Sequence, residues 1–143
     1  INLHGVGTLI KVDEKITSNV YIEILQQGIE EAKEKLNIEF FRLQDDNAGT
    51  HRSKDVERYK EQNHIQSLPT WPPNSPDLNP IENIWLYLKD KIRAREPKTL
   101  RELEEVAFEE WNLIPVEEVA KKIRELPKRL AAVKRSRGLH TRF

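Results

Sequence analysis

The segment from residue 69 to residue 80 restricts the fold of this chain most strongly, because five of its twelve residues are proline. Proline fixes its own φ angle and restricts the residue before it, so the segment is expected to be a stiff, extended connector. The connector ends in Asn79-Pro80-Ile81-Glu82, which places a capping side chain, a proline at the first helical position and an acid in the first turn. The sequence therefore predicts a helix that starts at about residue 80 and continues to about Ala94.

Upstream of this connector, strand-like and helix-like patterns alternate. Residues 8–12 and 38–43 are rich in β-branched or aromatic side chains and predict strands, and a brief strand is expected at 65–68. Apolar positions recur every three to four residues over 18–36, which predicts an amphipathic helix, and a polar helix is expected over about 52–62.

Downstream of the connector the pattern is helical. A helix is expected over 99–113 and another from Val116, which Pro127 should kink or break. Strand and helix alternation followed by helices predicts an α/β domain with a mixed or parallel sheet and an α-helical C-terminal part. We assign residues 1–97 to the core that contains the sheet, and residues 98–143 to C-terminal helices and a basic tail packed on the same domain.

Charge is segregated along the chain although the formal net charge is zero, with 24 basic and 24 acidic side chains among 143 residues. Residues 1–50 hold five basic and nine acidic side chains, whereas residues 121–143 hold nine basic side chains and a single acid, Glu125. A tail with a charge of about +8 suits contacts with phosphate groups. The alternative is a solvated helix face with a frayed end.

Composition argues against several other classes of protein. Without a run of about 18 apolar residues or a signal-peptide pattern, the chain is expected to be a soluble intracellular segment with no membrane partner. The absence of cysteine excludes disulfides and cysteine-based zinc sites, so a metal ion would be held by carboxylates or histidine. Methionine is absent as well, and a chain that opens at Ile1 is expected to be a fragment of something longer.

Three carboxylates are the best candidates for such a site. Asp45 and Asp46 follow the second predicted strand, where chemistry gathers in α/β sheets, and Glu82 lies in the first turn after the connector. Paired carboxylates favour a hard ion such as Mg²⁺ or Mn²⁺. Two alternatives need no metal: Glu82 can complete a capping box with Asn79, and Asp45-Asp46-Asn47 can be a plain turn.

Longer motifs match one known family. The run from Trp71 to Trp85, WPPNSPDLNPIENIW, closely resembles the signature W-P-x-x-S-P-D-L-N-P-I-E-N-x-W of mariner-superfamily DNA transposases. The run Gln44-Asp45-Asp46-Asn47 with His51 resembles the family's Q-D-N-x-x-x-H. Residues 127–130 (PKRL) and 137–143 (RGLHTRF) resemble its P-K-R-L and G-x-H-T-x-Y/F endings, and residues 5–9 and 21–25 resemble its hairpin strand and the helix that follows. The resemblance spans essentially the whole chain.

The resemblance implies a ribonuclease-H-like catalytic domain with a mixed sheet flanked by helices. In this family two Asp and a final Glu bind two divalent ions, Mg²⁺ or Mn²⁺, nick DNA at transposon ends and join the freed 3′-hydroxyl to a target. Asp46 matches the second Asp, because Asn47 follows it and His51 comes five positions later, and Glu82 matches the final Glu. The 35 residues between Asp46 and Glu82 are one more than in the best-known branches, so Asp45 remains the alternative to Asp46.

The family's first Asp has no match here. It lies on a strand upstream of the glycine-rich hairpin in which this chain begins, and Asp13 lies instead in the turn before the first predicted helix. We therefore expect an N-terminally truncated catalytic domain that is inactive or nearly so by itself, since a two-metal site would lack one ligand. The alternative is a decayed or host-adopted transposase remnant that acts as a DNA-binding module through its basic end.

The family also implies DNA as a partner, both transposon ends and target. Candidate DNA contacts are His51 and five basic residues near the C-terminus, Lys128, Arg129, Lys134, Arg135 and Arg137. His51 can also be a capping or surface residue. The resemblance implies a homodimer in the complete protein–DNA complex, and a nuclear location in a eukaryote or a cytoplasmic one otherwise.

Overall fold

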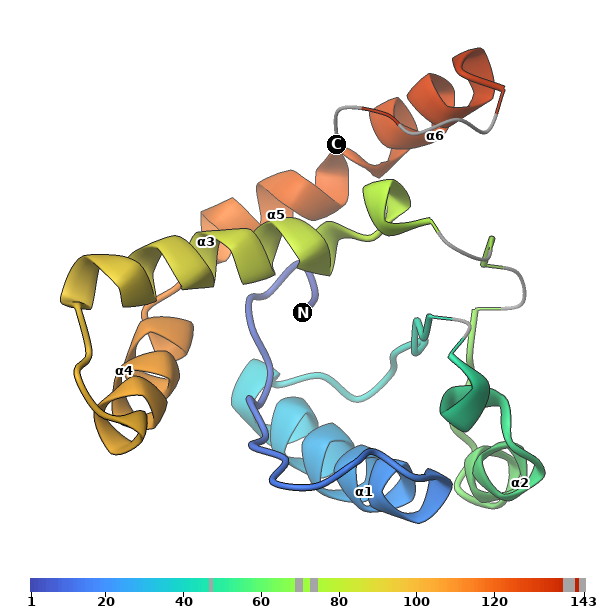
Figure 1. The fold of residues 1–143 in the computed structure, drawn as a ribbon. Helices are drawn as coiled ribbons and strands as arrows, with labels where there is room; N and C mark the ends of the chain where they lie inside the picture. The colour runs from blue at the N-terminus through green and yellow to red at the C-terminus, as the bar shows by residue number, and fades with distance from the viewer. Residues whose placement is uncertain (47, 69–70, 73–74, 138–140, 142–143) are drawn as a thin grey trace. The chain divides into compact units, whose positions relative to one another are not determined.

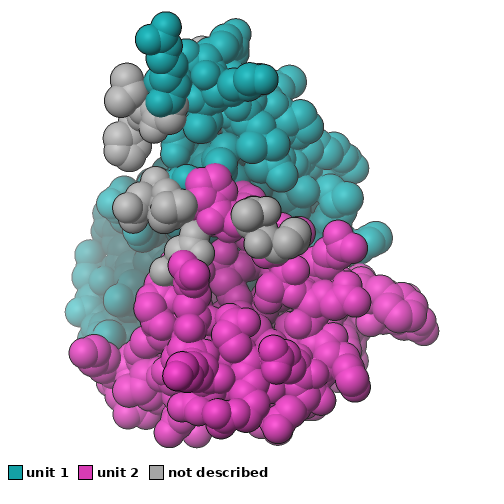
Figure 2. All heavy atoms as spheres, turned by 90° about the vertical axis from the view of Figure 1, so that its right-hand side faces the viewer, with its two compact units in different colours: residues 1–6, 75–143 teal, residues 7–74 magenta. Residues whose placement is uncertain are grey.

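The computed structural model describes residues 1–46, 48–68, 71–72, 75–137 and 141, and its regular elements within them are helices (Figure 1). The chain divides into two compact units. One consists of residues 7–74, and the other of residues 1–6 with residues 75–143 (Figure 2). We call them the 7–74 unit and the C-terminal unit. Among the described residues, no helix is both long and apolar enough to cross a membrane.

The 7–74 unit is built on α1 (Ser18–Leu36), as the apolar periodicity predicts. Thr17 caps its start, with its Oγ1 accepting the N–H of Val20 at 3.4 Å. The helix ends at Asn37, which adopts the left-handed conformation with φ of 49° that asparagine tolerates well.

A short 3-10 helix, η1 (Gly49–Arg52), and helix α2 (Lys54–Gln62) pack against α1. Tyr21, Leu25 and Val56 form the buried centre of this unit, and four partly buried apolar side chains surround it: Ile22, Ile29, Leu43 and Tyr59. The predicted polar helix over about 52–62 is thus confirmed as α2 with η1 before it.

The strands expected in this unit are not formed among the described residues. Residues 38–43 and 65–68 share a single isolated parallel bridge between Leu43 and Ser67. In it, the N–H of Leu43 donates to Gln66 at 2.7 Å and Leu43 accepts from Leu68 at 2.9 Å. A strand needs repeated pairing along its length, so one bridge does not make a ladder, and the predicted mixed sheet is not confirmed.

The segment that was expected to be a strand at 8–12 runs instead along α1 (Figure 1). Two glycines permit the close approach: a Cβ on Gly7 would lie 3.1 Å from Cβ of Ala32, and one on Gly28 would lie 3.3 Å from Cδ1 of Ile10. The Lys35 ammonium also donates to the Gly7 carbonyl at 3.1 Å. Contacts with α1 therefore take the place of the expected strand pairing here.

The described part of the C-terminal unit contains five elements, of which the first lies within the proline-rich connector. They are η2 (Pro76–Leu78), α3 (Pro80–Arg95), α4 (Leu100–Asn112), α5 (Val116–Arg124) and α6 (Leu126–Arg135). Helix α3 starts as predicted, with Asn79 as its cap and Pro80 at its first position. The break expected near Pro127 is confirmed, because α5 ends at Arg124 and Pro127 lies in the first turn of α6.

Helix α3 is the centre of this unit and packs against η2, α4 and α5, while α6 packs against η2 and α5. The rings of Trp85 on α3 and Trp111 on α4 stack at 5.1 Å between centroids, so Trp85 is a packing residue between these two helices. Leu78, Ile84 and Val119 are fully buried around the start of α3. These apolar contacts hold the proline-rich signature segment onto the helices that follow it.

Candidate functional site

Asp45 is an internal structural residue. Its Oδ2 accepts a hydrogen bond from the Lys60 ammonium at 2.6 Å and its Oδ1 accepts one from the Tyr21 hydroxyl. Only 14% of the Asp45 side chain and 6% of the Lys60 side chain are exposed. Burial, followed by the hydrogen bond to Asp45, raises the pKa of Tyr21 well above its usual range, so the phenol remains a donor. Asp45 therefore ties α1 to α2.

Asp46, the next residue, faces solvent, with 62% of its side chain exposed. Its Oδ1 accepts the N–H of Ala48 at 3.0 Å and lies 2.7 Å from Nδ1 of His51. Among the described residues, its Oδ2 has no hydrogen-bond partner. Asp46 does form the local turn that its sequence permits, and it still offers a carboxylate oxygen to solvent.

His51 orients Asp46. The His51 ring stacks on the ring of Tyr21 at 3.9 Å between centroids and an interplanar angle of 24°, which fixes the ring over α1. The Lys60 ammonium lies 3.4 Å from the His51 carbonyl and holds the backbone of η1. The sequence suggested a DNA contact for His51, and the structure places its Nδ1 against the candidate metal ligand.

Glu82 is exposed in the first turn of α3. The capping-box alternative requires its carboxylate to accept the backbone N–H of Asn79. That N–H instead donates to the carbonyl of Pro76 at 2.9 Å, while the Asn79 side chain accepts from Ile81 at 3.4 Å. The start of α3 is thus capped without Glu82, whose carboxylate has no partner among the described residues.

Asp46 belongs to the 7–74 unit and Glu82 to the C-terminal unit, and each is described in its own unit. Within the described residues, no group of three or more histidine, aspartate or glutamate side chains gathers in a way that could hold a metal ion. Both candidate ligands offer carboxylate oxygens, which suit a hard cation such as Mg²⁺ or Mn²⁺. Asp45, occupied by Lys60 and Tyr21, does not offer its oxygens in this way.

Arg129 requires a correction. It was expected to contact DNA, yet its side chain is 1% exposed and its guanidinium is bound within the protein. Nη1 donates to the backbone carbonyl of Asp77 at 3.1 Å, and Nη2 donates to Oδ1 of Asn83 and lies 3.4 Å from Oε2 of Glu125. Helix α6 is amphipathic: Arg129 lies on its buried face, whereas the side chains of Lys128, Lys134 and Arg135 are exposed.

The other predicted DNA contacts of the tail, Lys128, Lys134, Arg135 and Arg137, are exposed. Thr141 belongs to the resembled C-terminal ending and binds the signature segment: its N–H and its hydroxyl donate to Oδ2 of Asp77 at 2.9 and 3.0 Å. Asn47, and the motif residues Gly138, His140, Arg142 and Phe143, lie outside the described residues.

Sequence reasoning missed Tyr21 and Lys60, which hold the Asp45–Asp46 segment from α1 and α2. Tyr21 is one of the apolar positions of an amphipathic helix, and Lys60 lies in a polar helix. A lysine four residues after Val56 on the buried face of α2 is the one signal that could have identified a buried cation.

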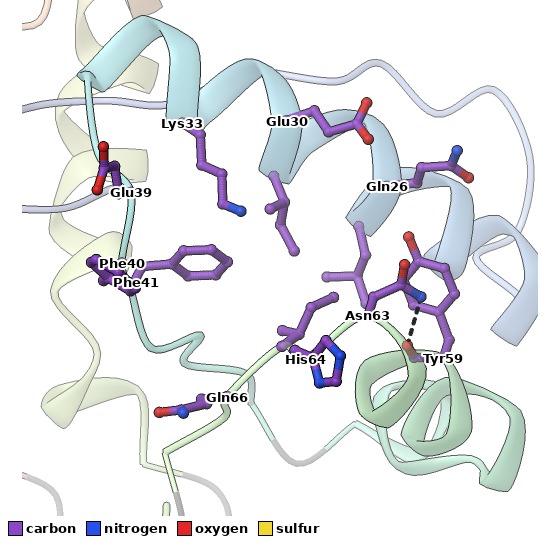
Figure 3. A pocket seen from close by; sticks show the side chains of 13 residues that line it. Gln26, Glu30, Lys33, Glu39, Phe40, Phe41, Tyr59, Asn63, His64 and Gln66 are labelled. Atoms are coloured by element: carbon purple, nitrogen blue, oxygen red, sulfur yellow. Dashed lines mark hydrogen bonds between the residues drawn. The ribbon is translucent and has the colours of Figure 1, made fainter.

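The 7–74 unit also contains a pocket of about 240 Å³ beside α1 (Figure 3). Lys33, Phe41, Tyr59 and His64 are among the residues that line it, with the Lys33 ammonium 5.4 Å from the Phe41 ring centroid. This volume is below the roughly 300 Å³ at which small-molecule sites begin. The pocket includes none of the candidate catalytic residues.

Comparisons with known proteins place these motifs in a family. The family model described as DDE superfamily endonuclease matches residues 1–104. The Tc3 transposase of Caenorhabditis elegans is 31% identical over 129 residues, covering 89% of this chain and 39% of that protein. The Tcb2 transposase of Caenorhabditis briggsae is 26% identical over 135 residues, covering 94% and 49%. The chain spans less than half the length of these relatives.

Solved structures give the fold. A structure of the Mos1 transposase catalytic domain with raltegravir and Mg matches with a TM-score of 0.81 at 19% identity, covering 99% of this chain and 74% of that one. A crystal structure of the catalytic domain of Mos1 mariner transposase matches with a TM-score of 0.79, covering 99% and 72%. The chain has the fold of that catalytic domain. Together with the family model, which matches well over half of the chain, this establishes that the chain belongs to the DDE superfamily endonucleases, with transposases of the Tc1/mariner group as its homologues.

Proposed function

We propose that this chain is part of the catalytic domain of a DNA transposase. In its complete form, the protein would cut DNA at transposon ends and join the freed ends to a target, using divalent metal ions. The observation that carries the proposal is the contrast between neighbouring carboxylates: Asp45 is only 14% exposed and is paired, whereas Asp46 is 62% exposed with one oxygen without a partner among the described residues. Asp46 and Glu82 are the positions that match the family's second Asp and final Glu.

Asp46 and Glu82 are proposed as ligands of Mg²⁺ or Mn²⁺. Two such ions in a complete site would activate the attacking oxygen and stabilise the leaving oxygen of a phosphodiester. His51 holds one oxygen of Asp46 in place through the 2.7 Å contact, which leaves the other oxygen directed to solvent. Glu82 stands in the first turn of α3 with its side chain exposed.

The exposed side chains of Lys128, Lys134, Arg135 and Arg137 are proposed as phosphate contacts, with Arg129 removed from that set. We further propose a ribonuclease-H-like sheet in the complete domain, supported by the parallel bridge between Leu43 and Ser67. Residues 1–97 would contribute to the sheet-containing core and residues 98–143 would pack on it. Homodimer formation on DNA, and a nuclear location in a eukaryotic host or a cytoplasmic one otherwise, are proposed on the family resemblance alone.

The test is nicking of transposon-end DNA by the complete open reading frame in Mg²⁺ or Mn²⁺. Asp46→Asn and Glu82→Gln are each expected to lower the rate by at least about a hundredfold, since a lost ligand removes transition-state stabilisation. Asp55→Asn on α2 and Asp90→Asn on α3 are matched controls, because both carboxylates are exposed and pair with arginines of their own helix. Nicking that survives Glu82→Gln would show that the assignment of that residue is wrong.

A further inference from the structure

The start of α3 is held from two sides by one arginine. The segment from Asp77 to Asn83 contains the cap of α3, its first turn and Glu82. The Arg129 guanidinium donates to the backbone carbonyl of Asp77 at one end of this segment and to the side chain of Asn83 at the other. Glu82 lies between the two attachment points.

Thr141, from the C-terminal ending, binds the same segment independently of Arg129. Oδ2 of the buried Asp77 carboxylate accepts both the N–H and the hydroxyl of Thr141, at 2.9 and 3.0 Å. Asp77 is thus bound through its backbone by Arg129 and through its side chain by Thr141. Two C-terminal residues, 46 or more positions from their acceptors, fix the segment that carries Glu82.

The chemistry of arginine suits this arrangement. A planar guanidinium presents nitrogen donors in a rigid fork, so Nη1 and Nη2 can bind two acceptors at once, whereas a lysine ammonium is a single point. The buried charge of Arg129 is balanced by the carboxylate of Glu125, which lies 3.4 Å away and immediately precedes α6. Since breaking a buried ion pair leaves an uncompensated charge, the guanidinium is held firmly where it is.

We propose that Arg129 is a positioning residue for Glu82: by bridging Asp77 and Asn83, it fixes the backbone of the first turn of α3, from which the Glu82 side chain projects for metal binding. The inference rests on the proposed function of Glu82 as a metal ligand. It gives a role to two residues of the signature, Asp77 and Asn83, and it separates Arg129 from the exposed basic residues of the tail. Thr141 contributes to the same positioning, because it binds the Asp77 carboxylate.

The test follows amide NMR signals of the 143-residue chain in Arg129→Lys, which keeps the charge and loses the fork. We expect hydrogen exchange at Glu82 and Asn83 to accelerate about tenfold. Mn²⁺-induced broadening of the same amide signals should require about tenfold more metal. A tenfold loss is the lower end of the decrease in metal affinity when a residue that orients a ligand is lost. The control is Arg124→Lys, because Arg124 is an exposed arginine of α5 that pairs with Glu117 at 3.4 Å. It should change neither quantity.

A second pair of variants keeps the test decisive if Arg129→Lys does not fold. Asn83→Asp retains an acceptor for Arg129 and should keep exchange slow, whereas the similarly sized Asn83→Leu removes the acceptor and should accelerate it. Wild-type exchange in Asn83→Leu would overturn the positioning role. Wild-type exchange or unchanged Mn²⁺ broadening in a folded Arg129→Lys variant would overturn it as well. A Glu82→Gln variant that binds Mn²⁺ like the wild type would instead overturn the assignment of Glu82 as a metal ligand. The exchange rates would still report whether Arg129 fixes the first turn of α3.

Discussion

At the scale of single residues, the buried ion pair of Asp45 and Lys60 organises the candidate site. The ammonium and carboxylate are 2.6 Å apart and almost fully enclosed, and the Tyr21 hydroxyl completes the carboxylate's hydrogen bonds. An enclosed charge is tolerated only with such partners. The pair fixes the backbone from which Asp46 projects into solvent, and the Tyr21 side chain bound to Asp45 is also the one on which the His51 ring stacks.

Replacement of Lys60 by methionine should therefore be costly. Lys60→Met keeps the volume of the side chain and leaves Asp45 buried without its counter-charge, so we expect a loss of about 3–5 kcal/mol in the free energy of unfolding. Urea denaturation of the chain measures it. Arg58→Met is the control, since the Arg58–Asp55 pair is exposed on both sides and should contribute less than about 1 kcal/mol. A similar small loss for both variants would contradict the structural role of the pair.

Tyr21 should give the protein a recognisable pH dependence. Its pKa is raised in the folded state, chiefly by burial, so above about pH 10 the unfolded chain releases the phenol proton while the folded chain keeps it. The folded state then binds more protons, and the free energy of unfolding falls as pH rises. The decline between pH 10 and 11 should be shallower in Tyr21→Phe by up to about 1.4 kcal/mol per pH unit. Equal slopes in the two proteins would contradict this prediction.

The residues of the site were only partly predictable. The sequence placed two acids after an extended segment, and the family motif preferred Asp46 over Asp45. Which of the two is buried depends on Tyr21 and Lys60, 24 and 15 residues from Asp45 in the chain, and no local pattern encodes those contacts. The composition of the C-terminal residues indicated a basic tail. That Arg129 is buried within the protein is evident only from the packing of α6 against η2.

At the scale of elements, helix boundaries followed local chemistry. Thr17, Ser53 and Asn79 each cap a helix with their own side chain, and Pro127 divides α5 from α6. Caps and prolines act within a few residues, so a sequence reveals them directly. Strands depend on distant partners, and the segments at 38–43 and 65–68 meet in only one bridge among the described residues.

The cap of α3 should matter for both stability and the position of Glu82. Asn79→Ala removes the acceptor of the Ile81 N–H, 3.4 Å away, and should lower the free energy of unfolding by about 1 kcal/mol. Thermal and urea unfolding measure the loss. Lys89→Ala, on the exposed face of the same helix, should cost nothing, because alanine favours helices at least as well as lysine. Equal stability of the Asn79 variant and the wild type would show that the cap contributes nothing to α3.

At the scale of the whole molecule, a net charge of zero conceals a separation of charge. The candidate metal ligands lie upstream, in the 7–74 unit and at the start of α3, and the exposed basic side chains of the tail lie on and beyond α6. This separation suits a protein whose carboxylates bind cations and whose basic side chains bind a polyanion. Phosphate binding depends on the local Lys and Arg side chains of the tail and not on the net charge of the chain.

DNA binding by the chain should accordingly depend on four exposed cations of the tail. Replacement of Lys128, Lys134, Arg135 and Arg137 by glutamine is expected to weaken binding to duplex DNA. It should also reduce the slope of log affinity against log salt by up to about 3.6, because each phosphate contact contributes about 0.9. Fluorescence anisotropy across a salt series measures both. Unchanged affinity and slope would exclude these residues as phosphate contacts.

We propose that Asp46 and Glu82, and not Asp45, bind the catalytic cations. The most direct measurement is the anomalous scattering of Mn²⁺ in crystals of the complete protein. We expect a peak within about 2.3 Å of the Asp46 carboxylate and one within the same distance of the Glu82 carboxylate, as for oxygen ligands of a small divalent cation, with Lys60 still bound to Asp45. Mn²⁺ bound to Asp45, or bound elsewhere while Asp46 and Glu82 stay without metal, would contradict it.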